Sequence, residues 1–185
     1  ETWAHLVATV LPGYVANTVL LAAGAAGLAG VIGTAAAWTI SQYDFPGRGT
    51  LQWTLVLPLA LPLYVSAQAF GGLFEYSGPV NHLWTAVVHA FAPDTTSYLS
   101  IRNLPGLIVV SAFALYPYVY LTVRNWFESQ AGRLLEAGRS VASERRVALR
   151  LALPRARPAL IGGMVLVIME TLNEYGAPLY FGVST

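Results

Sequence analysis

The chain has 185 residues, of which 56% are hydrophobic and 10% are charged, and its formal net charge is +1. Soluble globular domains carry about 25% charged residues. The composition therefore argues against a water-soluble globule and favours a membrane protein. The sequence has no Cys, which excludes disulfides, thiol nucleophiles and thiolate metal sites. It begins with Glu rather than Met and shows no signal-peptide pattern, so we expect a fragment of a longer protein.

Four stretches are candidates to span a membrane, namely residues 17–40, 51–73, 104–123 and 159–183. The first would reach about 36 Å as a helix, which exceeds a hydrocarbon core of roughly 30 Å. We predict an all-α, polytopic bundle with about four spanning helices, in which residues 1–185 form a single, incomplete transmembrane domain. Residues 1–16 are predicted to lie along the outer interface, and Pro79–Phe91 to form a short helix in the outer loop.

The arginines are distributed unequally between the two sides of this predicted bundle. All ten basic residues are Arg, and nine fall in loops on one side, whereas Arg102 falls on the other. The positive-inside rule makes the nine-Arg side cytoplasmic and places both ends of the chain outside. Trp38, Trp53 and Trp126 fall at the predicted cytoplasmic ends of spans, as interfacial aromatic residues do.

Glycine and proline distinguish the spans from one another. The first span has four glycines that predict close helix packing: Gly24, Gly27, Gly30 and Gly33. Prolines in the second and third spans predict kinks, which either fit neighbouring helices or line a water-filled pathway. The pathway interpretation names Pro58, Pro62, Tyr64, Gln68, Tyr116 and Pro117.

The fourth span carries two carboxylates, Glu170 and Glu174. Their i, i+4 spacing predicts that they share one helix face. They could handle a cation, form a gate, act as an acid–base pair in a membrane enzyme, or bond to neighbouring helices near the outer interface. His82 and His89 are seven residues apart rather than four, so the sequence predicts no metal site.

The segment from Leu134 onward is the most informative part of the chain. Residues 134–141 can form one helix, and Ser143 can cap a second that Pro154 ends. Pro158 then lies where the fourth span begins. On charge alone this arginine-rich segment could be an ordinary cytoplasmic loop or a surface for anionic lipid. Its acidic residues and spaced Ala, Gly and Pro instead favour docking to a soluble partner.

This segment resembles the EAA loop of the permease subunits of bacterial binding-protein-dependent ABC importers. Glu136 and Ala137 match that pattern, as do Leu151, Leu153, Pro154 and Pro158 at its far end. Gly138 replaces the second Ala, the internal Gly of the pattern is missing, and Leu-Pro arrives one residue early. The stretches YDFPGRG, LVLPLALPLYV, LYPYVYL and METLNEYGAPLYFGV resemble the ferric-iron branch of these permeases.

The resemblance implies a multi-pass permease of the bacterial inner membrane, which forms a translocation pathway for a substrate, and the branch that it resembles implies ferric iron. It implies a cytoplasmic ATPase dimer, a substrate-binding protein, a second permease half and membrane lipid as partners. ATP would be hydrolysed by the ATPase, so this chain is expected to be no enzyme and to bind no cofactor or nucleic acid. The alternatives are a membrane-integral enzyme or a secondary transporter that uses Glu170 and Glu174.

The resemblance also assigns residues 129–158 as the cytoplasmic coupling loop, with residues 143–153 as the helix that the ATPase receives. The residues predicted to couple this chain to the ATPase are Glu136, Ala137, Gly138, Ser143, Glu144, Arg145, Arg146, Leu153 and Pro154. No catalytic residue is predicted.

Overall fold

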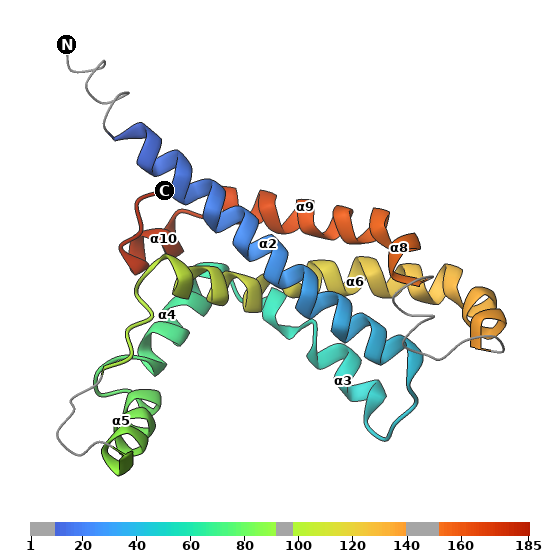
Figure 1. Cartoon of the computed structure of the whole chain (residues 1–185), viewed down its shortest axis with the longest axis horizontal. Coiled ribbons are helices and arrows are strands. Elements are labelled where there is room, and N and C mark those ends of the chain that lie inside the picture. Colours follow the sequence, from blue (N-terminus) through green and yellow to red (C-terminus); the bar gives the residue numbers. More distant parts are fainter. Residues whose placement is uncertain (1–9, 92–97, 140–151) are drawn as a thin grey trace.

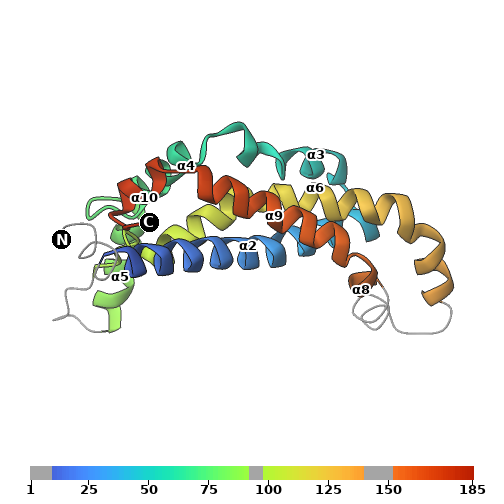
Figure 2. The ribbon, with the colours of Figure 1, turned by 90° about the horizontal axis from the view of Figure 1, so that it is seen from above.

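The computed structural model describes residues 10–91, 98–139 and 152–185, and these are helical with no strand among them (Figure 1). The helices in chain order are α2 (Leu11–Gln42), α3 (Arg48–Thr54), η1 (Leu57–Ala60), α4 (Leu63–Leu73), α5 (Pro79–Phe91), α6 (Leu104–Arg139), α8 (Leu153–Arg155), α9 (Arg157–Asn173) and α10 (Gly176–Phe181). Three long helices, α2, α6 and α9, pack side by side and form the bundle. The bent chain of α3, η1 and α4 lies against them (Figures 1 and 2).

The predicted spans correspond to helices of different kinds. Helix α2 and residues Leu104–Ser129 of α6 are each long and apolar enough to cross a membrane, and the bent pair Arg48–Ala60 and Leu63–Leu73 makes a third if its two parts form one span. Helix α9 has 17 residues, the lower end of the range of about 17–25 residues for a spanning helix. The all-α, multi-spanning prediction is therefore confirmed.

The first span is longer than its sequence pattern indicated. Helix α2 has 32 residues and begins at Leu11, with Pro12 in its first turn. Backbone N–H groups in the first turn have no partner within the helix, so the N–H that proline lacks costs no hydrogen bond there. Residues from Leu11 onward are thus continuous with the apolar helix α2, which is longer than a span of about 20 residues requires. The remainder of the predicted interfacial segment, residues 1–9, lies outside the described residues.

Small residues let α2 and α9 approach α6 closely. A Cβ atom added to Gly33 would lie 2.8 Å from the carbonyl oxygen of Tyr116, and one added to Gly163 would lie 2.7 Å from Cα of Val119. Val119 itself is fully buried between them. The predicted close packing is confirmed at Gly33 and also at Gly24, where an added Cβ would lie 2.9 Å from Ile108, but Gly27 has no atom within 4 Å.

The second predicted span is divided by its two prolines. Its helices bend by 99° between Ala60 and Leu63. Pro58 lies in the first turn of the short helix η1, and Pro62 is the N-cap of α4 with an extended ψ of 143°. Because each proline lacks an N–H and disfavours helix before it, the chain cannot continue as one straight helix here.

The third and fourth spans differ from their predictions in opposite ways. Helix α6 continues without interruption through Pro117 and on to Arg139, so residues 134–139 are its last turns rather than a separate helix. Helix α9 stops at Asn173, and Glu174 has extended backbone angles, φ −88° and ψ 121°. The prediction that Glu170 and Glu174 share one helix face is therefore wrong.

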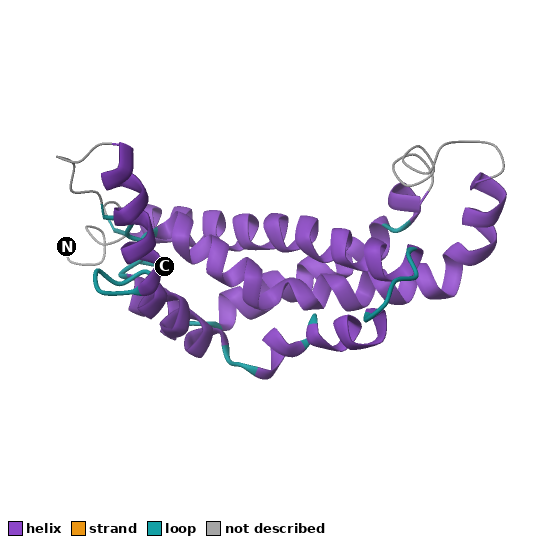
Figure 3. Ribbon diagram, turned by 90° about the horizontal axis from the view of Figure 1, so that it is seen from below, coloured by secondary structure: helices purple, strands orange, loops and turns teal. Residues whose placement is uncertain are grey.

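The two ends of the bundle are distinct. The start of α2, the outer helix α5 and the C-terminal α10 lie at one end, and α3, α8 and the last turns of α6 lie at the other (Figure 3). This arrangement agrees with the predicted topology, in which Arg102 and the chain ends share the outer side. Helix α5 has the predicted bounds Pro79–Phe91. The buried amide of Asn81 bonds the carbonyl oxygens of Phe74 at 2.6 Å and Leu99 at 3.2 Å and so anchors α5.

Candidate translocation pathway and coupling surface

Two interruptions of spanning segments lie next to each other. Helix α4 starts after the bend at residues 61–62, and α10 starts after the interruption of the fourth span at residues 174–175. We call these two interruptions the paired breaks. A Cβ added to Gly176, the first residue of α10, would lie 3.0 Å from Cδ2 of Tyr64 on α4. The helices also meet farther out, where the ring of Tyr180 packs against Gly71.

The side chain of Glu174 bonds backbone amides at one of the paired breaks. Its Oε1 atom accepts hydrogen bonds from the backbone N–H of Gly176 at 2.8 Å and of Ala177 at 3.1 Å. A carboxylate in this position satisfies amide groups that a helix start leaves unpaired. The carboxylate is therefore engaged in holding α10.

Glu170 has different surroundings from Glu174. It lies one turn before the end of α9, is exposed, and makes no hydrogen bond or ion pair to any described residue. Its neighbours Leu166 and Met169 are also exposed, at 41% and 55%. A carboxylate on a spanning helix is costly to place in lipid and is normally met by protein or water.

The polar residues of α4 lie beside the paired breaks. The side-chain amide of Gln68 donates to the hydroxyl oxygen of Tyr64 at 2.6 Å, and both side chains are exposed. The exposed ring of Tyr175 belongs to the other break, between α9 and α10. Hydroxyl and amide donors thus gather where the two spans are interrupted.

The structure brings together only part of the predicted pathway set. Pro62, Tyr64, Gln68 and Glu174 lie at the paired breaks, and Pro58 lies before the bend, in η1. The other members, Tyr116 and Pro117, are buried in α6, and Glu170 is exposed on α9. The role of each in a pathway stays a prediction.

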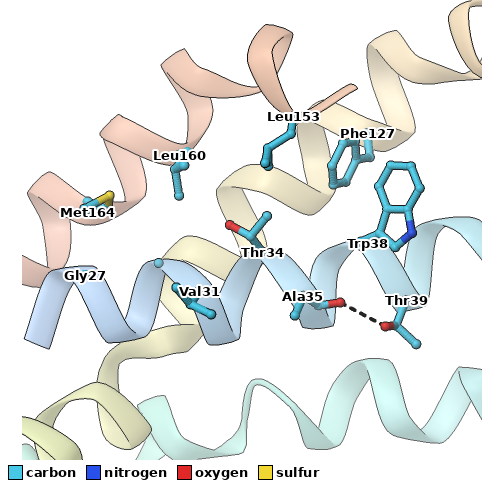
Figure 4. A pocket seen from close by; sticks show the side chains of 11 residues that line it. Gly27, Val31, Thr34, Ala35, Trp38, Thr39, Phe127, Leu153, Leu160 and Met164 are labelled. Atoms are coloured by element: carbon cyan, nitrogen blue, oxygen red, sulfur yellow. Dashed lines mark hydrogen bonds between the residues drawn. The ribbon is translucent and has the colours of Figure 1, made fainter. Parts of the chain in front are cut away.

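An apolar pocket of 580 Å³ lies on another side of the bundle, between α2, α6 and α9 (Figure 4). Trp38, Phe127, Leu153 and Met164 are among the side chains that line it. The hydroxyl of Thr39, one of the polar groups that line the pocket, is already bonded to the backbone, since it donates to the carbonyl oxygen of Ala35 at 2.9 Å. A charged substrate needs several donors or acceptors to replace its water, so this pocket is a poor pathway for an ion.

The predicted coupling residues fall in three parts of the chain. Residues Glu136, Ala137 and Gly138 are in the last turns of α6, whereas Ser143, Glu144, Arg145 and Arg146 lie outside the described residues. Leu153 and Pro154 belong to the short helix α8. Pro154 lies in the first turn of α8, where proline is tolerated. The helix that it was predicted to end falls mainly outside the described residues, so that role stays a prediction. Pro158 lies in the first turn of α9, as predicted.

A polar network that the sequence did not reveal joins α3 to α6. The Arg124 guanidinium donates from Nη2 to Oε1 of Gln52 at 2.8 Å, from Nη1 to the Tyr120 hydroxyl at 3.1 Å, and from Nε to Oε1 of Glu128 at 2.7 Å. We call these residues the Arg124 network. The i, i+4 spacing of Tyr120, Arg124 and Glu128 was the available signal, but Gln52 is distant in sequence and only the fold brings it near.

Comparison with known proteins identifies the family. Residues 29–185 match the model of the binding-protein-dependent transport system inner membrane component. The chain belongs to this family. The chain is thus part of a multi-pass inner-membrane protein of a transport family, and no finding supports the alternatives of a membrane enzyme and a secondary transporter.

Individual relatives in this permease family are named for two kinds of cargo. The chain is 32% identical to the sulfate transport system permease protein CysT of Salmonella typhimurium, over 82% of this chain and 52% of that protein. It is 28% identical to the molybdenum transport system permease protein ModB of Azotobacter vinelandii, over 82% of this chain and 64% of that protein. It is also 28% identical to the sulfate permease CysW of Escherichia coli, over 86% of this chain and 52% of that protein.

These relatives correct one expectation. The permeases just named belong to sulfate and molybdenum systems, so the resemblance to the ferric-iron branch is not supported. The chain spans about half the length of the curated sulfate permeases that it matches, 52% in each of the two cases.

Proposed function

We propose that the chain is part of the permease subunit of an ABC importer for a tetrahedral oxyanion, sulfate or molybdate. The observation that carries the proposal is the set of neutral donors at the paired breaks, together with the cargo named for the relatives. Interrupted helices near the middle of a membrane are a recurrent way to build a transport site, because freed backbone and polar side chains can face the substrate.

The neutral side chains at the paired breaks, Tyr64 and Gln68, suit an anion better than a ferric cation. When the Gln68 amide donates to the Tyr64 hydroxyl, the hydroxyl hydrogen and the second amide hydrogen remain to point at a substrate. Neutral donors bind an oxyanion without the strong attraction that would hinder its release. A ferric ion would need anionic oxygen ligands, and the Glu174 carboxylate is already bonded to the start of α10.

Residues 129–158 would form the coupling loop, and an ATPase dimer would engage it on the cytoplasmic side. The named relatives CysT and CysW are both sulfate permeases of the same family, which supports a second permease half as a partner. A binding protein would deliver the oxyanion at the outer end, near α5 and α10. Closure of the ATPases would then shift the pathway between two states by rigid-body movement.

Uptake measurements test the proposed substrate class. The full-length permease, its ATPase and its binding protein would be reconstituted in liposomes with ATP inside, and uptake of radioactive sulfate and molybdate measured. We expect uptake of at least one oxyanion, competition by the other, and none with a non-hydrolysable ATP analogue. Uptake of ferric iron with no uptake of either oxyanion would overturn the proposal.

A further inference from the structure

Helix α3 forms the cytoplasmic part of the bent span, but few apolar contacts hold it. Neither α3 nor η1 has a buried residue. The apolar contacts of this region come from Leu55 and Val56, which are partly buried against the core and lie between the two helices. Gln52 is therefore the residue of α3 that ties the helix directly to α6, through the Arg124 network.

The partners of Gln52 on α6 are held rigidly. Tyr120 is fully buried, and its hydroxyl donates to the backbone oxygen of Gln52 at 3.3 Å. The same hydroxyl accepts from Arg124, whose side chain is 21% exposed and is also bonded to Glu128. Three contacts on one planar guanidinium leave it a single orientation. The side chain and the main chain of Gln52 are thus both bonded to fixed groups of α6.

We infer that Arg124 is a positioning residue that makes α3 move together with the cytoplasmic end of α6. The inference rests on the proposed function. Helix α6 is continuous from Arg124 to Arg139, and the predicted coupling loop starts in its last turns. A displacement of that loop by an ATPase would therefore reach α3 through Gln52, and α3 would carry it to the bend at residues 61–62.

The network differs from an ordinary surface ion pair. Arg48 and Asp44 also form a pair, but they belong to the same turn, and Asp44 is 91% exposed. Such exposed pairs contribute little to stability, and this pair connects no two helices. The Arg124 network joins residues 72 positions apart and lies in a partly buried site.

The first measurement tests whether the network fixes α3 to α6. This chain has no Cys, so spin labels can be placed at Gly49→Cys on α3 and Asn125→Cys on α6, with any other Cys of the full-length permease replaced. In the complex with its ATPase we expect one narrow distance distribution, unchanged by ATP. Gln52→Leu combined with Tyr120→Phe, which removes both the side-chain and the main-chain bond of Gln52, should broaden that distribution, whereas Gln52→Glu alone, which keeps an acceptor for Arg124, should leave it narrow. A narrow distribution in the double variant would overturn the inference.

The second measurement tests whether the link serves transport. In the reconstituted importer we expect Gln52→Leu to lower the amount of oxyanion taken up per ATP hydrolysed by about tenfold. This factor is near the lower end of the effect expected when a hydrogen bond to a charged group is lost. Thr54→Val is the matched control, because the Thr54 hydroxyl bonds only within its own region, to the carbonyl oxygen of Thr50. Gln52→Leu with a wild-type ratio would overturn the inference. If wild-type importer moves neither oxyanion, the proposed function fails instead, and the distance measurement still decides whether α3 is linked to α6.

Discussion

Helices α2, α6 and α9 contact one another through small buried residues, whereas α3 and η1 bury no residue at all. In the first region backbones meet so closely that an added Cβ on Gly33 or Gly163 would overlap Val119 or its neighbours. In the second region Leu55 and Val56 are only partly buried against the core, and the Arg124 network joins α3 to α6. Dense packing of the first kind resists displacement, whereas the position of α3 depends on the Arg124 network that fixes it to α6.

The same difference in packing distinguishes the two spans that contain internal prolines. Pro117 lies inside α6, fully buried, and the helix stays continuous around it. Pro58 and Pro62 lie in a segment with few buried neighbours, and there the chain bends by 99°. A proline therefore breaks a spanning helix where packing does not oppose the break.

The largest expected effect on stability comes from filling the contact at Gly33. Gly33→Leu should lower the free energy of unfolding by about 3 kcal/mol or more, because overpacking a rigid contact forces backbones apart. The added atoms would meet the backbone of Tyr116 and Tyr120. The thermal midpoint of the purified full-length permease in detergent is the measurement.

Gly27→Leu is the matched control for that change, because no atom lies within 4 Å of an added Cβ at Gly27. Its midpoint should stay close to that of the wild type. Equal midpoints for the two variants would mean that α2 and α6 are farther apart than the structure places them.

A smaller effect is expected at the paired breaks. Glu174→Ala removes the acceptor of the Gly176 and Ala177 amides and should destabilise α10 by about 1 kcal/mol, as loss of a helix cap does. Hydrogen exchange of those two amides should become faster. Glu174→Gln, which keeps one oxygen acceptor, should destabilise α10 less than Glu174→Ala does.

Glu170→Ala is the control for Glu174, because Glu170 makes no hydrogen bond to the described residues. We expect the exchange of the Gly176 and Ala177 amides to be unchanged in this variant. Unaltered exchange in Glu174→Ala would show that its carboxylate does not hold α10.

The smallest stability effect is expected for Tyr64→Phe, within about 0.5 kcal/mol, because the hydroxyl is exposed. If this hydroxyl contacts the oxyanion, uptake at low substrate should nevertheless fall by about tenfold. Tyr76→Phe is the control, since Tyr76 is 82% exposed in the outer loop. Equal uptake by the two variants would remove Tyr64 from the pathway.

Much of the fold was predictable because charge and hydropathy act along the chain. The long apolar stretches located the spans, and the unequal arginines gave a topology with which the ends of the bundle agree. The bend near Pro62 was likewise predictable from proline chemistry. The end of α9 was not, because nothing local forbids helix at Glu174, and its carboxylate instead bonds the amides of Gly176 and Ala177.

The candidate site was only partly predictable. Tyr64 and Gln68 were named from their place beside the prolines, and the structure puts Tyr64 next to Gly176 and bonds it to Gln68. Gln52 and Arg124 were missed, since residues 72 positions apart carry no mutual signal in one sequence. The proposed substrate class rests on the relatives, because selectivity depends on the arrangement of a few donors and composition does not report that arrangement.

By itself the sequence determined that this protein is helical, lies in a membrane and exposes its arginines mainly to one side. Those properties follow from the transfer of apolar and charged groups between water and lipid, which each residue contributes separately. Only the tertiary structure decided which interruptions meet, which carboxylate caps a helix, and which arginine joins α3 to α6. Such contacts depend on directed hydrogen bonds and close packing between segments distant in sequence, and these form only once the helices have docked.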